Sequence, residues 1–146
     1  MSILVLFGIV SLVFVVILVK TFWPHYVFLE GSEKCIYHYE YINYEGARSQ
    51  DAVELSSEHC QMLANIIAEK PFREALDVEK GLTPMYSLEF FDVSGDSTMI
   101  LIQYVRDGRI RINGTIWDRE IEGRSRELFF STLEGYHRHD QIIVGG

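Results

Sequence analysis

The segment His137-Arg138-His139-Asp140 brings two imidazoles and a carboxylate together near the C-terminus. Residues two apart on a strand share a face, so the imidazoles of His137 and His139 would converge on one ion if this segment were extended. A metal site also needs a third ligand, and the remaining histidines lie at no diagnostic spacing. We therefore predict no metal and no cofactor. The nearest approach to a ligand set is His137, His139 and Asp140, with solvated side chains as the alternative.

Other catalytic arrangements find less support in the sequence. Asp96 and Asp107 lie in expected turns, where aspartate hydrogen-bonds the backbone. Acid–base catalysis by carboxylates requires two of them in one cleft, which no spacing here indicates. Neither cysteine lies in a nucleophile motif, and the chain has no G-x-S-x-G elbow, P-loop or dinucleotide fingerprint. The sequence favours a non-catalytic protein over an enzyme.

Two stripes of side chains suit protein recognition better. One holds tyrosines on alternate residues of an expected strand, and the other holds arginines on a later strand and near it. Tyrosine and arginine are enriched among the residues that dominate binding at protein interfaces. The candidate binding residues are Tyr37, Tyr39, Tyr41, Arg109, Arg111 and Arg119. The alternative places the tyrosines in the core and the arginines on a solvated face.

The N-terminal run from Ile3 to Val19 contains no charged residue. As a helix it rises about 25 Å, and Thr21 to Trp23 bring it close to the roughly 30 Å thickness of the bilayer hydrocarbon. Nothing basic precedes the run and bulky residues follow it, which disfavours a cleaved signal peptide. We expect residues 1–24 to be a single-pass transmembrane anchor that contacts the membrane through residues 2–23. Residues 25–146 are then one soluble domain.

The side of the membrane stays open. Lys20 and Lys34 follow the apolar run and no basic residue precedes it, so the positive-inside rule places the domain in the cytoplasm. Cys35 and Cys60 would pair in an oxidising compartment, and in the cytoplasm they would be small buried hydrophobes.

Charge is spread unevenly along the chain. The formal net charge is −8, and residues 30–96 carry 14 acidic against five basic residues. An acidic first half argues against nucleic acid, which requires a basic footprint. It also disfavours adhesion to anionic lipid headgroups.

Hydropathy patterns predict a mixed domain. Residues 26–30 and the alternating residues 35–43 are typical of strands, and Tyr44 to Val53 resembles a surface loop. A helix is expected from Ser56 or Ser57 to about Lys70, and a short second helix from Pro71 to Leu76.

The second half predicts an antiparallel meander followed by a helix. The hairpin dipeptides Asp107-Gly108 and Asn113-Gly114 separate its later strands. The expected strands are residues 85–93, 98–105, 109–112 and 115–121, the expected helix is Ser125 to Glu134, and residues 141–144 are an edge strand or a tail.

These elements predict an α+β fold in which a transmembrane helix precedes a two-layer domain, with helices on one face of the sheet. We expect a membrane-anchored, non-catalytic module that binds another protein. A small anchored acidic domain of this layout resembles the membrane-bound immunity proteins that bacteria use against secreted toxins. The resemblance is one of layout and charge over the whole chain and rests on no motif. A subunit or assembly factor of a membrane complex has the same layout, and a tethered enzyme or metal-binding protein using His137, His139 and Asp140 is the alternative from another class.

Overall fold

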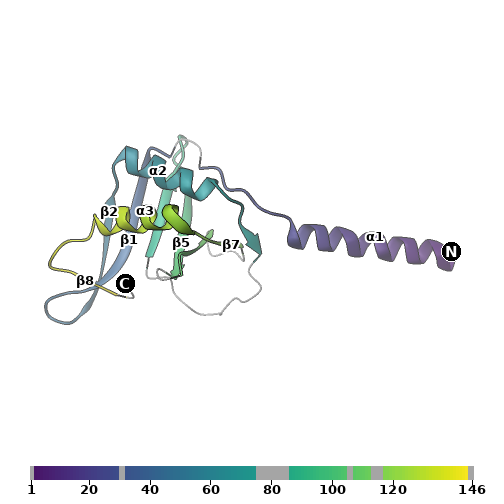
Figure 1. Ribbon diagram of the computed structural model, residues 1–146, viewed down its shortest axis with the longest axis horizontal. Coiled ribbons are helices and arrows are strands. Elements are labelled where there is room, and N and C mark those ends of the chain that lie inside the picture. The colour runs from purple at the N-terminus through teal and green to yellow at the C-terminus, as the bar shows by residue number, and fades with distance from the viewer. Residues whose placement is uncertain (1, 30–31, 75–85, 105–106, 113–116, 145–146) are drawn as a thin grey trace.

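The structure is a computed structural model that describes residues 2–29, 32–74, 86–104, 107–112 and 117–144. Helix α1 (Ile3–Phe22) extends away from a domain made of a sheet and two helices (Figure 1). The large apolar side chains of α1 are exposed from Ile3 to Val19. Within the part of the chain that is described, no helix is both long and apolar enough to cross a membrane.

Among the described residues, the domain consists of two helices and eight strands. In chain order the elements are β1 (Lys34–Ile42), β2 (Arg48–Glu54), α2 (Ser57–Ala68), β3 (Arg73–Glu74), β4 (Tyr86–Phe91), β5 (Ser97–Tyr104), β6 (Arg109–Ile112), β7 (Trp117–Glu120), α3 (Gly123–Glu134) and β8 (Ile142–Ile143).

All the described strands pair antiparallel in one sheet with the order β2-β1-β4-β5-β6-β7-β3. Strand β8 adds to the end of β1, where Tyr41 pairs with Ile143 and Ile42 with Ile142. The mixed α+β class is confirmed, and so is the meander β4-β5-β6-β7.

Helices α2 and α3 lie on the same side of the sheet (Figure 1). We call this side the helix face, and its alternate strand residues form the core with apolar side chains of both helices, including Leu63 and Phe129. Among the described elements no helix covers the opposite side, which we call the open face. The open face carries Ile36, His38, Glu40, Gln50, Ala52, Ser87, Glu89, Met99, Leu101, Arg109, Arg111 and Asp118.

Local sequence explains helix α2 and one of the predicted hairpins. The Ser56 side chain accepts a hydrogen bond from the backbone N–H of His59 at 3.3 Å, so Ser56 is the N-cap of α2. The predicted Asp107-Gly108 turn joins β5 to β6, and Gly108 adopts a positive φ of 67°. A Cβ at that position would lie 2.7 Å from the backbone oxygen of Ile121, so the turn requires glycine. The expected Asn113-Gly114 turn lies outside the described residues.

Three expected elements are wrong. Most of the loop expected from Tyr44 to Val53 instead belongs to β2, because seven residues of this polar stretch pair with β1 through their backbone. The expected helix at Pro71 is not formed: Phe72 exchanges two backbone hydrogen bonds with His25, of 2.9 and 2.7 Å, and Arg73 and Glu74 pair with β7. Residues 26–29 form no strand, and the preceding His25 forms only an isolated β-bridge with Phe72.

The two cysteines form a disulfide that joins β1 to α2. Cys35 and Cys60 lie with their Cα atoms 5.7 Å apart, and both are fully buried. A Cα separation of this size is typical of disulfides. Of the two alternatives that the sequence leaves open, the structure holds the paired one.

Candidate functional site

The tyrosine stripe lies on the helix face. Tyr37 and Tyr39 are each only 2% exposed, and Tyr41 is half-buried against the core. These rings therefore face the helices and not the open face, because the odd-numbered residues of β1 share their face with Cys35, which bonds to Cys60 on α2. Their role as binding residues stays a prediction, while the core alternative describes their packing.

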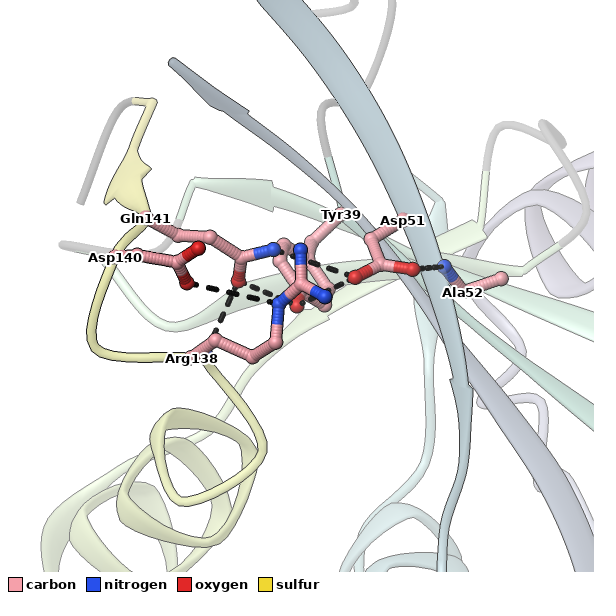
Figure 2. Close-up of polar contacts among 6 residues, drawn as sticks. All are labelled: Tyr39, Asp51, Ala52, Arg138, Asp140 and Gln141. Atoms are coloured by element: carbon pink, nitrogen blue, oxygen red, sulfur yellow. Dashed lines mark hydrogen bonds and ion pairs between the residues drawn. The ribbon is translucent and has the colours of Figure 1, made fainter. Parts of the chain in front are cut away.

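A hydrogen-bonded cluster fixes the segment that follows α3 to strands β1 and β2 (Figure 2). The Tyr39 hydroxyl donates to Oε1 of Gln141 at 2.7 Å and lies 3.3 Å from Oδ2 of Asp51. Nε2 of Gln141 donates to the same Asp51 oxygen at 3.3 Å, and the Arg138 backbone N–H donates to Oε1 of Gln141 at 3.0 Å. Burial, and then the charge of Asp51, raises the pKa of Tyr39. The phenol is therefore neutral and holds β1, β2 and the segment before β8 together.

Tyr39→Phe tests this role. It should lower the free energy of unfolding by about 1–2 kcal/mol, because it removes a buried donor and leaves Gln141 with one contact fewer. Tyr44→Phe is the matched control: Tyr44 is 89% exposed, so we expect a change within about 0.5 kcal/mol. Denaturant unfolding of the full-length protein measures both, and equal effects of the two substitutions would contradict the assigned role.

The proposed metal ligands do not converge. Nε2 of His137 lies 3.0 Å from the Tyr37 hydroxyl, and the ring centroids of His137 and Tyr39 are 4.7 Å apart. His139 and Asp140 are exposed, and Asp140 pairs with Arg138 at 3.7 Å. Among the described residues, no three His, Cys, Asp or Glu side chains are placed to hold a metal ion.

His137 predicts a pH dependence of stability. Burial lowers its pKa below the ordinary value near 6.5, with the charge of Glu134 acting in the opposite direction. The unfolded chain therefore binds a proton at this site at a higher pH than the folded chain, and stability falls as pH drops below about 6.5. His137→Gln should reduce the slope of unfolding free energy against pH between about 7.5 and 5. The exposed His139→Gln should keep the wild-type slope, and a steeper or unchanged slope in His137→Gln would overturn the assignment.

The three candidate arginines divide between the two faces. Arg119 is buried on the helix face, where Nη1 donates to the carbonyls of Ile66, Ile67 and Lys70 at 3.0, 2.7 and 3.1 Å. Ile66 and Ile67 belong to the last turn of α2, where backbone carbonyls run short of intrahelical partners, and Lys70 lies just beyond the helix. Burial lowers the pKa of Arg119, with the charges of Glu69 and Glu122 opposing it. Arg119 therefore lies buried at the end of α2 and not on an exposed surface, and its role as a binding residue stays a prediction.

Arg109 and Arg111 do lie on the open face. Both approach Oδ2 of Asp118 on the neighbouring strand β7, at 3.4 and 3.9 Å. The Arg109 side chain is 40% exposed, whereas those of Arg111 and Asp118 are 12% exposed. Arg109 is therefore the accessible member of this cluster. An acidic substitution at Arg111 would put a second carboxylate beside Asp118 in a poorly hydrated place.

A second feature of the open face is a hollow over β1 and its neighbours. Its volume is about 540 Å³, and it is lined by His38, Tyr39, Glu40, Gln50, Asp51, Ala52, Ser87 and Met99. Nε2 of Gln50 donates to Oε1 of Glu40 at 3.2 Å, while Oε2 of Glu40 is buried and finds no hydrogen-bond partner among the residues that the structure describes. At the side of the hollow, Nε2 of His38 lies 3.1 Å from Oε2 of Glu89. Glu40 and Asp51 are the carboxylates among the lining residues, and Glu89 lies beside the hollow through its contact with His38, so this region has a negative character.

Sequence reasoning missed Glu40 and Glu89. Alternation already placed His38 and Glu40 on the face opposite the tyrosines, and that was the available signal. The strand pairings that place Glu40 opposite Gln50 and Glu89 opposite Ile36 could not be predicted, because a single sequence does not reveal which strands are neighbours.

A comparison with protein families, with curated proteins and with solved structures finds no match to this chain.

Proposed function

We propose that the chain is a membrane-anchored, non-catalytic protein-binding module whose open face receives a basic segment of its partner. The observation that carries this proposal is the unpartnered, buried Oε2 of Glu40 in the hollow of the open face. A buried carboxylate oxygen calls for a hydrogen-bond donor. A lysine or arginine side chain supplies one with the opposite charge, and charge-assisted bonds of this kind are the stronger ones.

The surroundings of the hollow support a protein partner over a small ligand. Half-exposed Ile36, Phe91 and Leu101 lie on the open face beside the ion pairs His38–Glu89 and Arg109–Asp118. Apolar side chains bordered by charged ones are typical of interface patches. The acidic excess of residues 30–96 extends the same attraction over a longer range, which would speed encounter with a basic partner.

Helix α1 supports the anchoring part of the proposal. The run from Ile3 to Val19, which makes up most of this helix, carries no charged residue. Its described side chains are exposed throughout and lie away from the core. In water this apolar surface would be a liability for aggregation, whereas a bilayer would bury it.

We place the domain on the oxidising side of the membrane, as part of this proposal. The support is the disulfide between Cys35 and Cys60, since reducing compartments keep thiols unpaired. The positive-inside rule favours the other side, but it rests here on Lys20 and Lys34 alone. A structural disulfide is the stronger constraint, because the native packing already brings the two cysteines together.

The partner class follows from layout and charge. A toxin neutralised at the membrane, or a subunit of a membrane complex, is the expected partner, and in either case a basic segment enters the hollow. The layout shared with membrane-bound immunity proteins supports the first.

Co-purification from native membranes tests the proposal. Full-length tagged protein in mild detergent should retain a stoichiometric protein partner. The double variant Glu40→Gln and Glu89→Gln should lose at least tenfold of it, because both substitutions remove charge from the hollow while keeping side-chain shape. Retention should also fall with rising salt.

A matched control removes the same charge elsewhere. Glu45→Gln with Glu127→Gln changes two exposed carboxylates, one in the β1–β2 turn and one on α3. Equal loss of partner in the two double variants would point to net charge and overturn the assigned surface. No partner in the wild type would sink the binding proposal itself.

A further inference from the structure

A second hollow lies on the other side of the sheet, beneath the C-terminal end of α3. Its volume is about 220 Å³. Ile102 closes it from the sheet, Phe130 and Leu133 from α3, and Ile143 from β8. We call it the α3 cavity. It shares no lining residue with the hollow of the open face, so the two are distinct sites.

Tyr86 gives the α3 cavity an unused hydrogen-bonding group. Tyr86 lines the cavity and is 5% exposed, and its hydroxyl is buried with no hydrogen-bond partner in the described part of the chain. Buried polar groups without partners are rare and call for an explanation. The neighbouring hydroxyl of Tyr37 is already engaged, since it lies 3.0 Å from Nε2 of His137. The Tyr86 hydroxyl is therefore the hydrogen-bond donor that remains available to an occupant of this cavity.

Size and charge restrict what an occupant can be. An apolar cavity of about 150 Å³ admits benzene, so about 220 Å³ suits one substituted ring or a chain of similar bulk. Burial, and then the charge of Glu40, raises the pKa of Tyr86 to about 12, so its hydroxyl keeps its proton and can donate. Glu134 also lines the cavity, and its carboxylate together with the apolar walls disfavours an anion.

We propose that the α3 cavity binds a small, neutral, mainly apolar molecule whose carbonyl or hydroxyl oxygen accepts a hydrogen bond from Tyr86. The apolar part of such a molecule packs against Ile102, Phe130 and Leu133. Its oxygen satisfies the donor that the fold leaves unpaired. The site is separate from the open face, and binding here requires no protein partner.

Two ring compounds of matched shape test the site. Acetophenone carries the acceptor oxygen and ethylbenzene lacks it. With full-length protein in lipid nanodiscs and isoleucine methyls labelled for NMR, both should shift Ile102 and Ile143 and leave Ile36 on the open face unchanged. At equal free concentration, acetophenone should bind about twofold to tenfold more tightly, which is the range expected for one net hydrogen bond. Benzoate, an anion of the same bulk, should shift neither cavity methyl at that concentration.

Tyr86→Phe separates the hydroxyl from the shape of the cavity. This variant should bind the two compounds equally, with ethylbenzene affinity unchanged, and the Ile36 methyl signal checks its fold. Preference for acetophenone that survives in Tyr86→Phe would overturn the role of Tyr86. Absence of cavity shifts with both compounds in the wild type would show a cavity that holds water only, and would overturn the site. Should the variant fail to fold, equal wild-type affinities for the two compounds would still refute the proposed hydrogen bond.

Discussion

Arg119→Met is expected to lower the free energy of unfolding by about 3 kcal/mol. The substitution keeps a similar apolar stem but removes the guanidinium that donates to three carbonyls at the end of α2. Leaving buried acceptors without donors costs about 1–3 kcal/mol each, and partial entry of water into the loosened helix end offsets some of that loss. Denaturant unfolding of the full-length protein, followed by circular dichroism, measures the change.

Two further variants sharpen this test. Arg119→Lys retains the charge but not the breadth of the guanidinium, so it should lose roughly half as much. Arg124→Met removes an exposed arginine from α3 and should change stability by no more than about 0.5 kcal/mol. If Arg119→Met instead lost partner binding and kept its stability, the result would favour a binding role for Arg119 over its role at the end of α2.

Removing the disulfide is expected to have an effect of similar size. Cys35→Ala with Cys60→Ala should lower the free energy of unfolding by about 3 kcal/mol, because the bond closes a loop of 25 residues in the unfolded chain. For a domain of this size, that loss corresponds to a fall in Tm of roughly 10 °C. Reductant should destabilise the wild type by a comparable amount and leave the double variant unchanged.

The same bond tests the compartment. Protein denatured directly from its native membranes, with thiols blocked beforehand, should show both cysteines inaccessible to maleimide until a reductant is added. Two reactive thiols in the denatured protein would contradict the paired state in the cell and place the domain in a reducing compartment.

The strands with clear alternation could be predicted from the sequence. β1 follows from alternating aromatic residues, and the turn before β6 follows from Asp107-Gly108. β2 could not be predicted, because its sequence RSQDAVE contains one large apolar residue, Val53, and is held at the sheet edge by backbone pairing. β3 is similar: two residues pair with β7, a contact distant in sequence.

The candidate site was less predictable than the fold. Period two places Arg109 and Arg111 on one face of β6, but only the pairing of Ile110 with Arg119 shows that Arg119 faces the helices. Residue type suggested a binding role for all three, while strand register assigns one of them to the end of α2. The register also places Glu40 and Glu89 on the same face of neighbouring strands, although they lie far apart in the sequence.

Site-specific photo-crosslinking tests directly whether a protein partner binds through the open face. A photoreactive amino acid in place of Ala52, which lines the hollow of the open face, is compared with one in place of Glu127, which is exposed on α3. We expect a crosslinked protein partner from position 52, lost when Glu40→Gln and Glu89→Gln are added, and none from position 127. A partner captured from position 127 but not from position 52 would contradict binding through the open face.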